Sequence, residues 1–186
     1  MRASRRLVVV SGLPGSGKTT IARALAPLID LPVIDKDEIL ERLFDVRGTG
    51  DGDWRRQLSR EADAMLQADV ARSAGAIVCS FWHGAGMAPD SGTPTDWLVT
   101  LPGAIVNVHC ACPPDIAAER FLRRTRHAGH LDRVRSPADV IASIAALAAA
   151  GPPAIHERIT VDTTRPVEIT ALCRDVQAAM GRARTV

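Results

Sequence analysis

Hydrophobic and polar positions alternate along the chain in blocks that predict strands and helices in turn. Short, continuous apolar runs are typical of parallel strands buried on both faces of a sheet. Longer stretches repeat apolar residues at three- and four-residue spacing, which is the pattern of helices with one buried face. The predicted strands are 7–10, 31–35, 76–79, 104–112 and 158–161. The predicted helices are 18–30, 37–44, 54–75, 113–127, 137–150 and 166–181, with Pro27 expected to kink or end the first.

This regular alternation predicts an α/β fold in which a five-stranded parallel sheet is covered by helices on both sides. In such three-layer sandwiches ligands bind at the carboxyl ends of the strands. Residues 81–95 are rich in Gly, Pro and Ser and form no regular pattern, so we expect a binding loop there. No internal repeat or boundary interrupts the pattern, and a single domain over residues 1–186 is expected.

The composition of the chain argues against a membrane, secreted or nucleic-acid-binding protein. The chain has 186 residues and a net charge of +2, with no apolar run of the roughly 20 residues that cross a bilayer. The basic start of the chain is followed by only four apolar residues, which is too short for a signal peptide, so a cytoplasmic protein without a membrane role is expected. The four cysteines lack metal-site spacing, and reduced core thiols are the favoured interpretation. The small net charge and scarce aromatics make nucleic acid an unlikely partner, and a homodimer is left open.

The strongest chemical signal is a phosphate-binding loop between the first strand and the first helix. The run Gly12-Leu-Pro-Gly-Ser-Gly-Lys-Thr19 satisfies G-x-x-x-x-G-K-[ST] in full and lies in the required strand–loop–helix context. Lys18 is expected to bridge the β- and γ-phosphates of ATP or GTP, and the hydroxyl of Thr19 to ligate Mg²⁺. The alternative is an ordinary glycine-rich turn. The loop residues expected to bind the nucleotide are Gly12, Pro14, Gly15, Ser16, Gly17, Lys18, Thr19 and Thr20.

An acidic run follows the second predicted strand, near the phosphate loop in any sheet of this type. With its Asp35-Lys-Asp-Glu-Ile-Leu-Glu41 sequence, the chain resembles the P-loop small-molecule kinases of the nucleoside-monophosphate-kinase-like group. That group includes shikimate kinase, gluconate kinase, chloramphenicol phosphotransferase, zeta toxin and the kinase domain of polynucleotide 5′-kinase. The resemblance implies that Asp37 is the catalytic base and that Asp35 holds a Mg²⁺-bound water. Lys36 would contact the acceptor or the transferred phosphoryl group. The alternative is that Asp37 only caps the next helix, with Lys36 solvated.

Arginines cluster on and after the predicted helix 113–127. The run Glu119-Arg-Phe-Leu-Arg-Arg-Thr-Arg126 resembles the lid helix of these kinases, which implies a lid over residues 123–136. Arg124 is expected to bind the nucleotide and Arg126 to act in catalysis, because fixed cations stabilise the charge of the transition state. A solvated helix face is the alternative for either arginine. For His127 and His130, a surface position or contact with the acceptor is favoured over metal binding.

The third predicted strand ends in aromatic residues that suit an acceptor pocket. Phe81, Trp82 and His83 combine apolar walls with a polar group, although a small hydrophobic cluster is the alternative. Ser80 stands where many P-loop enzymes carry an acidic residue, which argues against an ATPase, motor or switch. After the fifth strand, Thr164 and Arg165 resemble the loop that contacts the nucleotide base, with an ordinary turn as the alternative.

These features together predict a phosphotransferase that uses ATP or GTP with Mg²⁺ and an alcohol as acceptor. The resemblance to chloramphenicol phosphotransferase implies that an antibiotic, such as a nucleoside or sugar-bearing compound, is a plausible acceptor in a resistance or self-resistance enzyme. A metabolite kinase for a sugar, a shikimate-like acid or a nucleoside is the nearest alternative. A non-catalytic nucleotide-binding regulator and a polynucleotide kinase are also left open.

Overall fold

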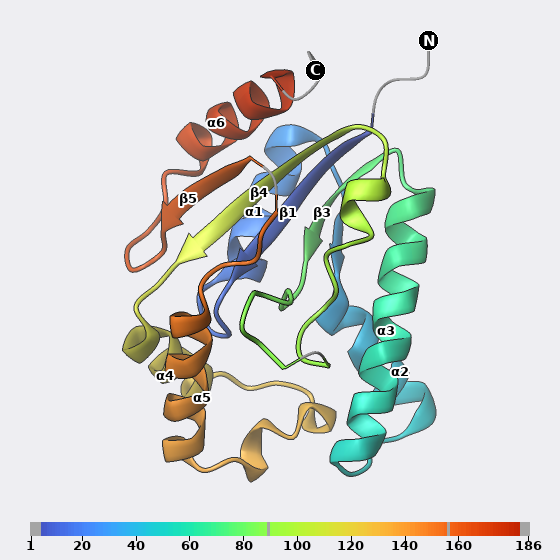
Figure 1. The fold of residues 1–186 in the computed structure, drawn as a ribbon, viewed down its shortest axis with the longest axis vertical. Coiled ribbons are helices and arrows are strands. Elements are labelled where there is room, and N and C mark those ends of the chain that lie inside the picture. Colours follow the sequence, from blue (N-terminus) through green and yellow to red (C-terminus); the bar gives the residue numbers. More distant parts are fainter. Residues whose placement is uncertain (1–4, 89, 156, 183–186) are drawn as a thin grey trace.

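The computed structural model describes residues 5–88, 90–155 and 157–182, and it contains one parallel sheet with helices on both faces (Figure 1). The five strands follow the spatial order β2-β3-β1-β4-β5, and every pair is parallel. The strands are β1 (Arg6–Gly12), β2 (Val33–Asp35), β3 (Gly75–Cys79), β4 (Ala104–Ala111) and β5 (Arg158–Asp162). Because all strands run in one direction, their carboxyl ends share one edge, where ligands of such sheets bind.

Helices form the outer two layers and also cover the carboxyl edge of the sheet. The helices are α1 (Lys18–Ile29), α2 (Lys36–Arg47), α3 (Gly52–Arg72), α4 (Pro114–Arg123), α5 (Pro137–Ala150) and α6 (Ile169–Arg182). Helices α1 and α6 pack on one face of the sheet, and α2 and α3 pack on the other. Helices α4 and α5 pair with each other near the carboxyl edge, below the strands in Figure 1. The predicted five-stranded, three-layer P-loop fold is therefore confirmed.

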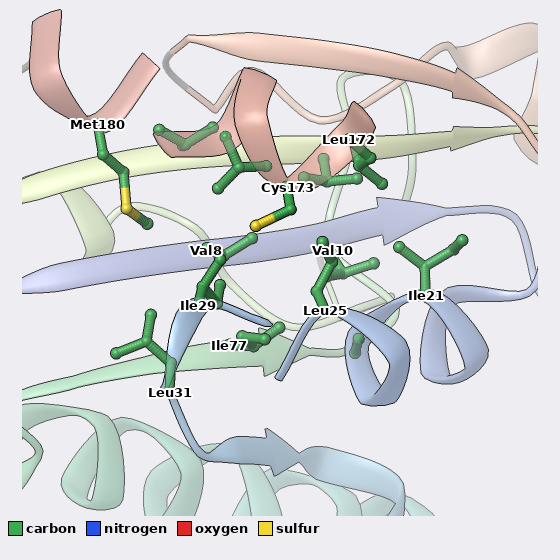
Figure 2. Close-up of a cluster of buried hydrophobic side chains, with 14 of the residues drawn as sticks. Val8, Val10, Ile21, Leu25, Ile29, Leu31, Ile77, Leu172, Cys173 and Met180 are labelled. Atoms are coloured by element: carbon green, nitrogen blue, oxygen red, sulfur yellow. The ribbon is translucent and has the colours of Figure 1, made fainter. Parts of the chain in front are cut away.

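The core follows from the continuous apolar runs of the central strands. In β1, Val8 and Val10 point toward α1 and α6, where they meet side chains such as Leu25 and Leu172 (Figure 2). Leu7 and Val9 alternate with them and pack against α2 and α3 on the other face. Burial of both faces explains why this strand shows no polar alternation in the sequence.

The predicted end of helix 113–127 was wrong. Helix α4 ends at Arg123 rather than near residue 127, because Arg124 adopts an extended backbone and its side chain lies over the ring of Phe121. The residues around Arg126 therefore belong to a non-helical segment. The predicted helix 18–30 agrees with α1, which contains Pro27, continues to Ile29 and closes at Asp30 in a left-handed conformation.

The helices and the cysteines bear on two predictions from the composition. None of the helices in the described part of the chain is long and apolar enough to cross a membrane. All four cysteines are free thiols, and three of them are buried, namely Cys79, Cys110 and Cys173. The predicted reduced core thiols are confirmed for these three, whereas Cys112 is only partly buried.

Candidate active site

The phosphate loop lies at the carboxyl end of β1, and its glycines have backbones that other residues rarely adopt. Gly15 and Gly17 have φ values of 84° and 88°, in the left-handed region. A Cβ atom on Gly15 would collide with the backbone carbonyl of Ala117 in α4, so α4 holds the loop from one side. The loop ends at Gly17, the residue before α1, whose positive end therefore faces the enclosed space. This geometry suits a bound phosphate chain.

Lys18 is the first residue of α1, and its ammonium group folds back over the loop. Its Nζ atom donates hydrogen bonds to the carbonyl oxygens of Gly12, at 3.1 Å, and Leu13, at 2.9 Å. Burial lowers the pKa of Lys18 from its ordinary value. An anionic phosphate would favour the charged form of the Lys18 ammonium group, so the environment of Lys18 suits binding of an anion.

Thr19 and Asp35 bring together two side-chain oxygen groups from neighbouring elements. The hydroxyl of Thr19 donates to Asp35 Oδ2 at 3.0 Å, and the backbone N–H of Asp37 donates to Asp35 Oδ1 at 2.9 Å. Asp35, not Asp37, therefore caps α2. Burial and the nearby Asp37 raise the pKa of Asp35. A cation bound beside Asp35 would therefore stabilise its ionised form. Mg²⁺ favours such oxygen ligands and completes its shell with water and phosphates, so these two residues fit the expected magnesium position.

Asp37 projects from the first turn of α2 and forms an ion pair with Arg126. Arg126 Nη2 lies 2.6 Å from Asp37 Oδ2. Asp132 accepts from Arg124 at 3.3 Å and from Arg126 at 3.4 Å, so one acidic residue joins both arginines. Burial acts to raise the pKa of Asp37, but Arg126 and the other cations around it hold the pKa below its usual value. Asp37 is therefore ionised at neutral pH, as a proton acceptor must be.

The segment after α4 reaches α2 through two histidines. His130 is 3% exposed, and its Nε2 atom lies 2.9 Å from Glu41 Oε1 and 3.0 Å from Arg126. His127 stacks on the ring of Phe44 and lies 3.3 Å from Asp45. His130 is thus buried rather than on the surface. These contacts hold the expected lid segment against α2, where Arg126 reaches Asp37.

Lys36 is buried and makes an ion pair that the sequence pattern did not predict. Its Nζ atom lies 2.7 Å from Asp63 Oδ1 in α3, and Asp63 also accepts from Thr93 at 2.7 Å. The hydroxyl of Thr93 lies 2.6 Å from that of Ser80, at the end of β3. Contact between Lys36 and an acceptor would require the ion pair with Asp63 to break.

The aromatic residues after β3 take different positions. Trp82 is 3% exposed and donates from Nε1 to the carbonyl oxygen of Val10 at 2.9 Å. His83 donates from Nδ1 to the carbonyl oxygen of Ser91 at 2.7 Å, and it does not line the neighbouring cavity. Phe81 and Trp82 do line that cavity, which has a volume of about 200 Å³. Its lining residues are Gly12, Leu13, Phe81, Trp82, Met87, His109, Cys110, Ala111, Cys112, Leu147, Ala148, Gly151, Pro152 and Pro153.

Thr164 and Arg165 follow β5, at the opposite edge of the sheet from Asp35 and Asp37. The backbone N–H and the hydroxyl of Thr164 both donate to Asp162, which closes a tight turn. Arg120 of α4 donates to the carbonyl oxygens of Thr163 and Thr164 at 2.9 and 3.3 Å. Arg120 therefore fixes this loop, a role that the sequence did not predict. Contact of the loop with a nucleotide base stays a prediction.

Three charged residues of the site escaped prediction from the sequence. The role of Asp63 depends on its ion pair with Lys36 of α2, and that of Asp132 on its ion pairs with Arg124 and Arg126 in the segment after α4. Arg55 of α3 is partly buried, and its Nε atom has no hydrogen-bond partner in the described parts of the chain. Burial and the nearby Arg126 lower the pKa of Arg55. The helical pattern of α3 was visible, but only the fold turns this residue toward Asp37 and Asp132.

Comparison with known proteins identifies relatives of the chain among P-loop proteins. A family model described as an AAA domain matches residues 8–139. A shikimate kinase from Corynebacterium glutamicum is 36% identical over 75 residues, covering 38% of this chain and 43% of that protein. A cytidylate kinase from Methanosarcina acetivorans is 34% identical over 71 residues, covering 38% of both proteins. The chain thus spans less than half the length of these two curated relatives.

Solved structures match over nearly the whole chain. A protein from Chloroflexus aurantiacus, provisionally described as a kinase, has a TM-score of 0.76 and 30% identity, with 94% of this chain and 98% of that chain covered. A gluconokinase from Sinorhizobium meliloti has a TM-score of 0.59 at 21% identity, with 97% and 94% covered, and shows the fold alone. The phosphate loop, the strand order and these matches agree, and the chain belongs to the AAA-domain family of P-loop proteins with the fold of the P-loop kinases.

Proposed function

We propose that this chain is a phosphotransferase that moves the γ-phosphoryl group of ATP or GTP, bound with Mg²⁺, to a hydroxyl group of a small molecule. The observation that carries the proposal is the 3.0 Å contact between Thr19 of the phosphate loop and Asp35. It brings a second carboxylate, Asp37, to the nucleotide side of the site. A nucleotide switch has no need for a second carboxylate there, whereas transfer to an alcohol needs a proton acceptor.

The transfer step assigns each group a simple role. The acceptor oxygen forms a bond to the γ-phosphorus, the bond from that phosphorus to the β–γ bridging oxygen breaks, and the nucleoside diphosphate leaves. The hydroxyl proton passes to Asp37 and then to solvent. Lys18, Arg124 and Arg126 balance the negative charge that spreads over the transferring group. Arg126 is paired with Asp37 in the structure, so the arrival of the triphosphate must draw Arg126 away and free the base.

The magnesium ion would arrive with the nucleotide and be held by Thr19 and, directly or through water, by Asp35. Bound there, it would supply positive charge to the phosphate oxygens. The raised pKa of Asp35 supports this assignment, because a carboxylate beside a second carboxylate is stabilised by a cation.

Two classes of small molecule are candidates for the acceptor. Relatives named shikimate kinase and cytidylate kinase favour a metabolite as acceptor. The cavity beside the phosphate loop, which Leu13, Phe81 and Met87 help to line, keeps a bulkier alcohol, such as an antibiotic, as a second candidate. A regulator would bind nucleotide without transferring its phosphoryl group to any acceptor.

An acceptor panel analysed by mass spectrometry tests the proposal. The panel contains sugars, shikimate-like acids, nucleosides, nucleoside monophosphates, hydroxylated antibiotics and a 5′-hydroxyl oligonucleotide. The expected result is a gain of one phosphoryl group on one small-molecule class. Nucleotide binding without transfer to any compound would support the regulator, and labelling of the oligonucleotide alone would support a polynucleotide kinase.

A variant pair then tests the base. Asp37→Asn is expected to lower kcat by about 10³-fold, because the amide cannot accept the proton, while nucleotide affinity persists. Glu38→Gln is the matched control, because Glu38 is the next residue of α2 and pairs with Arg23 on the surface. Equal turnover by Asp37→Asn and Glu38→Gln would remove Asp37 from the mechanism.

A further inference from the structure

We propose that the cavity between the phosphate loop, the segment after β3 and the carboxyl end of α5 is the acceptor subsite, and that it takes an uncharged, largely apolar part of the acceptor. This inference rests on the proposed function and names the chemistry of its acceptor. The cavity lies between residues 81–87, the end of β4 at residues 109–112, and residues 147–153.

The cavity adjoins the place where the phosphoryl group must be transferred. Gly12 and Leu13 line it, and their carbonyl oxygens accept the hydrogen bonds of the Lys18 ammonium. A γ-phosphate contacted by Lys18 would therefore stand at the edge of the cavity. Asp37 does not line the cavity, so an occupant would have to extend its hydroxyl beyond the cavity edge to reach both that phosphate and the base.

The chemistry of the lining favours an uncharged occupant. The side chains of Leu13, Phe81, Met87 and Leu147 supply apolar surface, and Pro152 and Pro153 add to it. Burial raises the pKa of Cys110 to about 12, so this thiol stays neutral. About 150 Å³ is enough to hold a benzene ring in an apolar protein cavity, so the 200 Å³ here suits one ring or a comparable group.

His109 is the one described lining residue that could become positively charged at moderate pH, and its surroundings keep it neutral. Burial, Arg158 and Lys18 lower the pKa of His109. The Arg126 and Arg124 side chains are paired with acidic residues outside the cavity lining. A carboxylate or phosphate in the cavity would therefore meet no cation among the described lining residues and would lose its hydration.

A buried network also orients the His109 ring. Ser11 Oγ donates its single proton to Asn107 Oδ1 at 2.8 Å, so the 3.0 Å contact between Ser11 Oγ and His109 Nδ1 requires a proton on Nδ1. In the neutral ring Nε2 then carries a lone pair, and no hydrogen bond joins Nε2 to any part of the chain that the structure describes. The network thus provides a hydrogen-bond acceptor on the cavity wall, suited to a hydroxyl or N–H group of the occupant.

Binding of two small probes to the full chain tests the proposal, with Mg²⁺ and a non-hydrolysable ATP analogue present. The probes are 2-phenylethanol and phenylacetate, which share a ring and differ in charge, and binding is measured by saturation-transfer NMR. We expect 2-phenylethanol to bind at least about tenfold more tightly than phenylacetate, because the carboxylate of phenylacetate would lose its hydration without gaining a positively charged partner.

Three variants locate the probe. Ala148→Phe fills the cavity and is expected to weaken binding of 2-phenylethanol about tenfold, whereas Ala149→Phe, at an exposed position of the same helix outside the lining, should not. His109→Asn retains a donor toward Ser11 but lacks the Nε2 acceptor, and it should weaken the alcohol about fivefold.

The outcomes separate this proposal from the proposed function. Loss of affinity for the ATP analogue in the unmodified protein would overturn both. If the analogue binds but 2-phenylethanol does not, or binds equally to Ala148→Phe, or binds no better than phenylacetate, the neutral acceptor subsite is overturned while the phosphotransferase proposal stands. A folded Ala148→Phe protein is verified by unchanged affinity for the ATP analogue.

Discussion

The phosphate loop and the charged cluster beside it form two parts of one site, but they are built in different ways. The loop is made by the backbone of eight consecutive residues, 12–19, held between β1 and α1. The charged cluster comprises Lys36, Asp37, Asp63, Arg126 and Asp132, which come from α2, α3 and the segment after α4. Lys36 pairs with Asp63 and Asp37 pairs with Arg126, each on another element, whereas Asp132 pairs with Arg126 within the segment after α4.

This difference determines how each part can fail. A backbone-built loop depends on conformations that only glycine adopts readily, so the loss of one glycine is local and severe. A side-chain cluster depends on charge balance, because a partner that loses its counter-ion stays partly buried and uncompensated. The loop should therefore be sensitive to shape, and the cluster to charge.

The largest expected effect is Gly15→Ala in the phosphate loop. We expect a loss of about 4 kcal/mol in the free energy of unfolding, from the left-handed backbone and from overpacking against the Ala117 carbonyl group. Urea denaturation measures the loss, and affinity for ATP with Mg²⁺ should fall with it.

Gly17→Ala provides the matched control for shape. Gly17 has nearly the same φ value, 88°, but a Cβ atom there meets no atom within 4 Å. Only the backbone strain remains, so the loss should be about 1 kcal/mol. Equal losses in Gly15→Ala and Gly17→Ala would show that α4 does not clamp the loop.

The same difference explains what the sequence could predict. The motif over residues 12–19 predicted the loop because its requirements are local. The continuous apolar runs predicted β1, β3 and β4 because these strands are buried on both faces, whereas the edge strands β2 and β5 are less buried and left shorter apolar signals. The resemblance to the kinase group implied a metal-site role for Asp35, which stays a prediction, and the contact of Asp35 with Thr19 agrees with its expected place near the phosphate loop.

The rest of the site depends on long-range pairing that spacing does not encode. A helix over residues 124–126 agreed with local preference, but Arg124 and Arg126 instead lie outside α4 and bind Asp132. Lys36 was expected to face a substrate, yet its partner Asp63 lies 27 positions along the chain, on α3. No sequence period relates these residues, so only the tertiary fold reveals the ion pairs.

The second effect concerns the buried ion pair of Lys36 and Asp63. Their side chains are 10% and 14% exposed, so Lys36→Met should leave Asp63 without compensation and lower the free energy of unfolding by about 3 kcal/mol. Thermal and urea denaturation measure the change.

Two comparisons test whether charge balance is the cause. Arg23→Met breaks an ion pair with Glu38 whose side chains are 64% and 49% exposed, and it should cost no more than about 0.5 kcal/mol. The double variant Lys36→Met with Asp63→Leu removes both charges and should recover most of the loss. A double variant as unstable as Lys36→Met alone would mean that packing, not charge, is responsible.

The smallest effect is a change in the pKa of Asp37 when Arg126 is replaced. Burial acts to raise this pKa, and the cations, with Arg126 foremost, hold it below the usual value. At pH values above the pKa that Asp37 has in the unfolded chain, the ionised carboxylate therefore stabilises the folded protein. This contribution is lost as the pH falls through the lower pKa of the folded protein. Arg126→Gln should raise the pKa of Asp37 toward or above its ordinary value, measured by the carboxyl ¹³C chemical shift in the nucleotide-free protein.

Arg123→Gln is the control for this titration, because Arg123 is exposed and pairs with Glu119 at 3.0 Å on the surface of α4. It should leave the titration of Asp37 unchanged, since a solvent-screened charge acts weakly at a distance. These results would show that Arg126 couples the segment after α4 to Asp37. Added ATP analogue with Mg²⁺ should draw Arg126 to the phosphates and so reduce the difference in the pKa of Asp37 between Arg126→Gln and the unmodified protein. If Arg126→Gln left the pKa of Asp37 unchanged, the segment after α4 would not hold the base in solution, and Asp37 would be available to an acceptor before any nucleotide binds.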